Sequence, residues 1–124
     1  MQFAQKLDDS SGICTITVTG MVKRPDDSAI LQQFALDFDN ETGCRRFLFD
    51  MRNADFVGGT MDVYKTGSFT ADTNHTQIRQ KMALVYKDIT EEHKFMETVA
   101  VNRGYQLRVF DKNGMNDAIE WLTN

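Results

Sequence analysis

The clearest hydrophobic pattern of the chain is an uninterrupted apolar run in the middle of the sequence, at residues 47–49, which Asp50 closes. A strand that is apolar without alternation is typical of one covered on both faces, as in the centre of a parallel sheet. We therefore predict a central strand over 45–51, followed by an irregular segment over 52–57 that leads to Gly58-Gly59. In an open α/β sheet, ligands usually bind at the loop that leaves such a strand.

An N-terminal hairpin is predicted before this strand. Residues 3–7 alternate as an edge strand does, residues 8–12 are turn-forming, and residues 13–19 are rich in β-branched side chains. The apolar positions of the second strand fall on one face, which we expect to be the core face: Cys14, Ile16 and Val18.

A helix is predicted between the hairpin and the central strand. Gly20 and Pro25 are expected to break the chain, the N-cap types at residues 26–28 follow, and Gly43 supplies the stop. Apolar residues at helical spacing form a stripe that should pack on the sheet rather than hold a partner: Ile30, Leu31, Phe34, Ala35 and Phe38.

The second half of the chain repeats helix and strand. We expect a helix near 60–67, then a buried strand over 82–86. A helix that starts at Thr90 and ends at Gly104 should bury Phe95, Met96, Val99 and Ala100.

The chain then closes with one more strand and helix. A strand over 105–110 should lie nearer an edge, because its apolar and polar residues alternate. The last helix, over 115–122, is expected to bury Ile119, Trp121 and Leu122. The order predicts one α/β domain over 1–124, with a mixed, mostly parallel sheet, an N-terminal hairpin, right-handed βα units and about four helices.

Composition narrows the functional classes. The net charge is −4, and basic residues adjoin only in single pairs such as Lys23-Arg24, so neither nucleic acid nor an acidic membrane surface is an expected partner. No run suits a signal peptide or a membrane span, and we expect a cytoplasmic protein. Two cysteines, Cys14 and Cys44, are expected to be reduced thiols in such a compartment.

These features together resemble the STAS family, whose best-known members are bacterial anti-sigma-factor antagonists. The likeness spans nearly the whole chain: the hairpin, the apolar strand ending in Asp50, the loop to a glycine-bearing helix start, and the closing strand over 104–110. Residues 118–122 also look like the end of an uncharacterised, SpoIIAA-like branch, one also compared with lipid-binding SEC14 domains. The resemblance implies a STAS-like fold and a non-enzymatic regulatory or scaffold role.

The loop after the central strand departs from the family pattern. In the antagonists this loop carries Asp-Ser-Ser-Gly or a close variant with a phosphorylated hydroxyl, whereas residues 55–60 here read Asp-Phe-Val-Gly-Gly-Thr. Thr60 is the one candidate phosphosite, since phosphate suits a helix N-terminus, although a plain N-cap is the preferred interpretation of the residue. The Asp-Ser-Ser-Gly lookalike at 9–12 lies in the hairpin turn.

Other chemistry-bearing residues do not form a motif. Asp50, Asp88 and Asp111 each follow a predicted strand and would suit a divalent cation at one sheet edge, but turn and cap roles account for them too. His75 and His93 lack a neighbour at metal-ligand spacing and are expected to be solvated. We expect no metal, no cofactor and no catalytic residue.

Apolar residues gather around the glycine loop, namely Phe56, Met61, Tyr64 and Phe69. They are either ordinary core or the lining of an apolar cleft. Our first hypothesis is a protein-partner or scaffold module, with a homodimer as one form of it. The alternative is a carrier or sensor of an apolar or lipid-like small molecule, and an enzyme using the acidic strand ends ranks last. The candidate binding residues are Asp55, Phe56, Gly58, Gly59, Thr60, Met61 and Tyr64.

Overall fold

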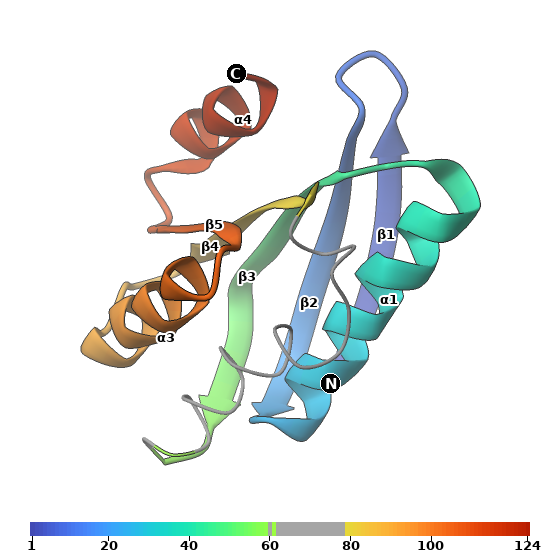
Figure 1. Ribbon diagram of the computed structural model, residues 1–124. Helices are drawn as coiled ribbons and strands as arrows, with labels where there is room; N and C mark the ends of the chain where they lie inside the picture. Colours follow the sequence, from blue (N-terminus) through green and yellow to red (C-terminus); the bar gives the residue numbers. More distant parts are fainter. Residues whose placement is uncertain (60, 62–78) are drawn as a thin grey trace.

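A computed structural model describes residues 1–59, 61 and 79–124 of the chain. Its sheet has five strands in the order β1-β2-β3-β4-β5, and the middle strand is β3 (Figure 1). The strands are β1 (Gln2–Asp8), β2 (Ile13–Lys23), β3 (Arg46–Val57), β4 (Lys81–Tyr86) and β5 (Gln106–Phe110). β1 pairs antiparallel with β2, and every other pairing is parallel. The predicted mixed α/β sheet with its N-terminal hairpin is confirmed.

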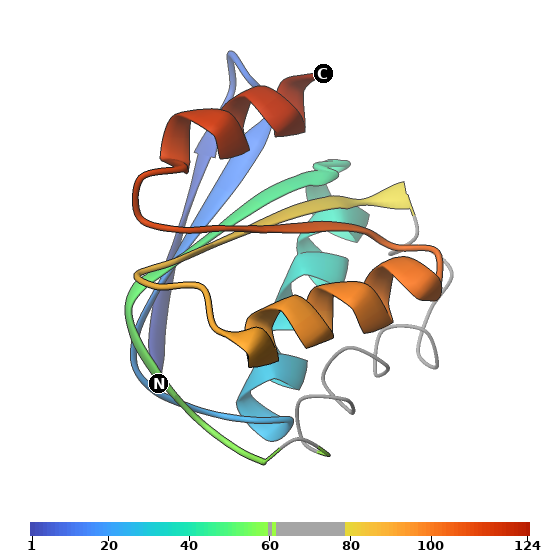
Figure 2. The same ribbon diagram turned by 90° about the vertical axis from the view of Figure 1, so that its left-hand side faces the viewer.

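Helices cover the two faces of the sheet unequally. α1 (Asp26–Thr42) and α3 (Glu91–Asn102) lie on one face, and α4 (Met115–Thr123) lies on the other (Figure 2). The buried residues accordingly form two clusters. The larger joins the sheet to α1 and α3 through Leu31, Ala35 and Met96, and the smaller joins it to α4 through Ala118 and Leu122.

The residues of β3 explain why its sequence does not alternate. Phe47 and Phe49 point into the larger cluster, whereas Leu48 points into the smaller one. All three side chains are buried, so successive residues of a pleated strand meet apolar surface on both sides. The prediction of a central strand covered by helices is therefore confirmed.

Two predicted strand ends are wrong. β3 continues to Val57, so Asp50 lies within the strand and residues 52–57 are not irregular; β2 likewise runs through Gly20 to Lys23. Beyond Met51 the extended β3 pairs with β2 alone, with a register shift near Thr17 that accommodates one extra β3 residue. The polar residues of this segment are tolerated because, among the described residues, no second strand pairs with it.

The predicted helix ends agree with the structure better than the predicted buried residues of the helices do. Gly43 ends α1 in the left-handed conformation, and Thr90 caps α3. Three residues expected in the core are instead exposed: Ile30, Phe95 and Ile119. In α1 the buried stripe is centred on Leu31 and Ala35, because the side of each helix that faces the sheet is set by docking and not by the apolar stripe alone.

The predicted helix near 60–67 falls outside the described residues, apart from Met61. The structure therefore describes three helices where about four are expected from the sequence. Among the described residues, none of these helices combines the length and the apolar character that a bilayer crossing requires.

Candidate functional site

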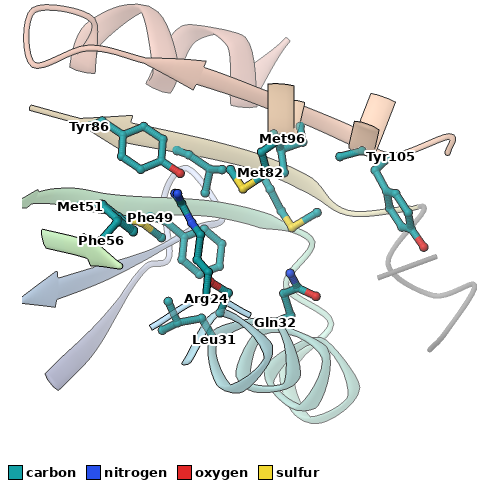
Figure 3. A pocket seen from close by; sticks show the side chains of 14 residues that line it. Arg24, Leu31, Gln32, Phe49, Met51, Phe56, Met82, Tyr86, Met96 and Tyr105 are labelled. Carbon is teal, nitrogen blue, oxygen red and sulfur yellow. The ribbon is translucent and has the colours of Figure 1, made fainter. Parts of the chain in front are cut away.

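A cavity of about 50 Å³ lies between α1, α3 and the sheet (Figure 3). Its floor is apolar and comes from alternate residues of β3 and β4, which a pleated sheet presents on one face: Phe49, Met51, Met82, Leu84 and Tyr86. α1 supplies Leu31 and α3 supplies Met96 and Ala100. The cavity is the gap that remains where the two helices dock side by side on the same face.

Arg24 is the charged residue of this cavity. It belongs to the connection between β2 and α1, and its backbone N–H donates to the Val57 carbonyl at 2.9 Å. Only 7% of the residue is exposed. The guanidinium carbon lies 4.4 Å from the centre of the Phe56 ring, a cation–π distance, and Nη2 has no hydrogen-bond partner among the described residues. No acid among the described residues lies within ion-pair distance of Arg24.

Three aromatic rings form a cluster beside Arg24, and two of them, Phe56 and Tyr86, line the cavity. The Phe56 ring meets Tyr86 and His93 edge to face, and the Tyr86 and His93 rings stack on each other. Figure 3 shows the Tyr86 hydroxyl directed toward Arg24. Burial raises the pKa of Tyr86 to about 12, although the charge and hydrogen bond of Arg24 work against the shift. The phenol therefore keeps its proton at neutral pH and remains a hydrogen-bond donor.

His93 is part of the same cluster and corrects the expectation of a solvated histidine, because it is buried. Its Nδ1 accepts from the Thr90 backbone N–H at 3.2 Å, and its own backbone N–H donates to the Thr90 hydroxyl at 3.3 Å. Burial, followed by the charge of Arg24, lowers the pKa of His93 to about 4, while a backbone hydrogen bond with Asp88 opposes the shift. The imidazole is thus neutral at physiological pH.

The predicted binding residues divide between the cavity and the surface. Phe56 lines the cavity, whereas Asp55, Gly58 and Gly59 are exposed at the end of β3 and just beyond it. Gly58 has a φ of 151°, which favours glycine, and Met61 is exposed. The remaining candidates, Thr60 and Tyr64, lie outside the described residues together with Phe69 and His75, so phosphorylation of Thr60 stays a prediction.

The three aspartates considered for a cation do not gather. No group of three metal-ligating side chains is found in the described part of the chain. Asp50 instead holds the Arg52 guanidinium through two hydrogen bonds of 2.8 Å, and the pKa of its carboxyl is lowered chiefly by that contact. Asp111 accepts the backbone N–H of Asn113, as a turn residue does.

Arg24 and Tyr86 are functional candidates that sequence reasoning missed. Arg24 was interpreted only as half of a basic pair, since nothing local distinguishes a buried arginine from a solvated one. Tyr86 was assigned to a buried strand, which is right, but its position beside Arg24 depends on the connection after β2 lying next to the end of β4. The structure brings together residues more than sixty positions apart, and no spacing rule reveals that.

A scan against protein-family models finds no match for this chain, and a search of curated proteins finds no significant one. A search of solved structures finds an uncharacterized protein of the DUF3478 family with a SpoIIAA-like fold, from Shewanella loihica PV-4. The two chains are 15% identical, with a TM-score of 0.49 over 98% of this chain and 92% of the other. This likeness carries no function over to this chain.

Proposed function

We propose that this chain is a non-enzymatic binding module that holds a small molecule in the cavity between α1, α3 and the sheet. The observation that carries the proposal is the cavity itself, an apolar space that contains one buried charged side chain, Arg24. Ligand sites in proteins are mostly apolar concavities with a few polar groups that fix orientation. The sequence analysis gave a small-molecule carrier as the alternative function, with the ligand near the glycine loop. The proposal keeps that function but places the ligand in the interior, and Phe56 belongs to both sites.

The volume limits the size of the ligand. At about 50 Å³ the cavity exceeds the roughly 10–15 Å³ that holds one water and is smaller than the roughly 150 Å³ engineered cavity that binds benzene. It therefore suits a molecule of a few carbon atoms, or one end of a longer molecule. Methionine side chains are flexible, so Met51, Met82 and Met96 can repack to admit a larger group.

The methionines also supply the experiment. The chain has seven methionines, and three of them line the cavity. In a protein labelled with ¹³C at the methionine methyl groups, we expect propionate or its neutral analogue propionamide to shift the signals of Met51, Met82 and Met96. Because the labelled methyls of Met1, Met21, Met61 and Met115 lie elsewhere, they are internal controls. If neither probe shifts the three cavity signals selectively, the proposal is wrong.

A cavity-filling variant locates the bound probe. Ala100 lines the cavity from α3, whereas its neighbour Val101 is exposed on the same helix. Ala100→Leu should fill the space and weaken probe binding at least fivefold, while the matched Val101→Leu variant should bind as the wild type does. Equal binding by both variants would place the ligand outside this cavity.

A second candidate function is docking of a protein partner at the end of β3, as the first sequence hypothesis has it. It is favoured by two exposed apolar side chains at this end of the strand, Val57 and Met61, which are 50% and 64% exposed. A photo-crosslinking amino acid at position 57 should then capture one defined partner in the host cell, and the same group at exposed position 101 should not. The same products from both positions would remove this candidate.

A further inference from the structure

The unpaired nitrogen of Arg24 identifies the kind of ligand that the cavity accepts. Charged side chains are almost never fully buried unless they are paired, because removing them from water is costly. Phe56 compensates part of that cost through its ring face, yet in the described part of the chain Nη2 has no acceptor. A buried guanidinium nitrogen without an acceptor is a position at which a negatively charged ligand gains a charge-assisted hydrogen bond.

Three described acids are engaged with other groups. Asp27 Oδ2 accepts the backbone N–H of Lys23 at 2.8 Å, and Asp50 is held by Arg52. Asp39, which is also buried, accepts Gln80 Nε2 at 3.1 Å. None of these carboxylates is recorded as an ion-pair partner of Arg24, so the counter-charge is missing from the described part of the chain.

We propose that the cavity binds a small organic carboxylate, with its oxygens at Arg24 Nη2 and the Tyr86 hydroxyl and its short apolar chain against Met51, Met82 and Met96. The inference rests on the proposed function, since it names the ligand class of the same site. A guanidinium N–H forms a charge-assisted hydrogen bond to a carboxylate oxygen, and the single positive charge of Arg24 balances the single negative charge of the ligand. A phosphate dianion would bring a surplus charge into an apolar space, which is unfavourable.

The hydroxyl of Tyr86 makes the second contact because it is a buried donor beside Arg24 (Figure 3). Ser28 and Gln32 of α1 also line the cavity and supply further polar atoms on its helix side. On the opposite side, Met96, Ala100 and Leu107 contribute apolar side chains. This division of polar and apolar walls would orient the ligand, with its charged end toward Arg24 and its hydrocarbon end toward β4 and β5.

Two probes of nearly the same shape test this assignment on the wild-type protein. Propionate and propionamide differ in charge and not in size. We expect the methionine-methyl titration to show propionate binding at least tenfold more tightly than propionamide, because the hydrogen bonds to a charged group are lost with the amide. Tyr86→Phe, which removes one donor and keeps the ring, should narrow this difference severalfold.

A matched pair of variants isolates Arg24. Arg24→Met keeps an apolar side chain over Phe56 and removes the charge, and Lys23→Met removes one charge from the exposed neighbouring residue. We expect Arg24→Met to abolish the preference for propionate and Lys23→Met to retain it. Far-UV circular dichroism confirms that both variants are folded before titration.

The outcomes separate this inference from the proposed function. If propionamide binds the wild-type cavity as tightly as propionate does, the carboxylate assignment is wrong while the binding module stands. If Lys23→Met loses the preference as fully as Arg24→Met does, the effect is one of overall charge and the assignment is again wrong. If neither propionate nor propionamide shifts the signals of the cavity methionines selectively, both the carboxylate assignment and the proposed function are wrong.

Discussion

The rings of His93 and Tyr86 stack face to face, with centroids 3.6 Å apart and planes 10° from parallel. This contact joins the first turn of α3 to the last residue of β4. It also buries the imidazole next to the Arg24 charge, which favours the neutral form. The stack therefore places the His93 imidazole beside the residue that carries the proposed site.

The first prediction is that stability falls on acidification through the window between pH 6.5 and pH 4. An unfolded histidine protonates near pH 6.5, whereas folded His93 does so near pH 4. The unfolded state binds more protons between these values, so the contribution of His93 is complete above pH 6.5 and is lost as the pH falls toward 4. We expect about 3 kcal/mol of unfolding free energy to be lost, measured by urea denaturation.

The matched control for this pH effect is His93→Gln. Glutamine at the third position of a helix can accept from the N-cap N–H, so the capping contact is retained while the titrating group is removed. The variant should show a flatter pH profile than the wild type in this window. Parallel profiles would show that other groups cause the acid sensitivity.

The second prediction concerns the cap of α3. The Thr90 side chain accepts the His93 backbone N–H, which has no partner within the helix. Thr90→Ala should lower the free energy of unfolding by about 1 kcal/mol. Thr98→Ala, on the exposed side of the same helix, removes a hydroxyl that donates to the Lys94 carbonyl and should change stability little. Equal losses in the two variants would contradict a specific capping role.

The sequence predicted the frame of the protein because its strongest signals are local. The apolar run over 47–49, the turn residues before Ile13 and the capping residue Thr90 each fix an element without help from distant contacts. The end of β3 was not predictable in this way, since residues 52–57 are a strand only because the long β2 pairs with them. The exposure of the Ile30 and Ile119 side chains was not predictable either, because it depends on how the helices dock on the sheet.

The candidate site was predicted least well, because it is built from contacts between distant segments. Phe56 was chosen from the apolar residues near the glycines, and it does line the cavity. Its partners Arg24, Tyr86 and His93 come from three other segments. Their burial is a property of the assembled sheet and helices. The charge of Arg24 and the polarity of His93 therefore give no sign in the sequence that these residues are buried.

The third prediction is that the Cys14 thiol is unreactive in the folded protein. Both cysteines are unbridged and buried, and burial, together with the nearby Cys44, raises the pKa of Cys14 to about 11. Very little thiolate is present at pH 8, and the sulfur is inaccessible. In a Cys44→Ala variant, labelling by a disulfide reagent should therefore be slow in native buffer and immediate in denaturant. Rapid labelling in native buffer would contradict the buried position.

The fourth prediction is a measurable coupling between Asp50 and Arg52. Their two short hydrogen bonds are formed on a half-exposed surface of β3, where solvent weakens the attraction. A double-mutant cycle with Asp50→Asn and Arg52→Gln should give a coupling of about 0.5–1 kcal/mol in urea denaturation. Since the pKa of Asp50 is lowered in the folded state, this coupling should be present at neutral pH and lost on acidification. Strictly additive single variants would show that the pair contributes nothing.

The most direct test of the account is a crystal structure of the protein grown with propionate. We expect density for the carboxylate within hydrogen-bond distance of Arg24 Nη2 and the Tyr86 hydroxyl, with the hydrocarbon end against the cavity methionines. A carboxylate of the chain itself at Nη2, or a guanidinium turned out of the cavity toward solvent, would contradict the central claim that Arg24 is a buried charge held for a ligand.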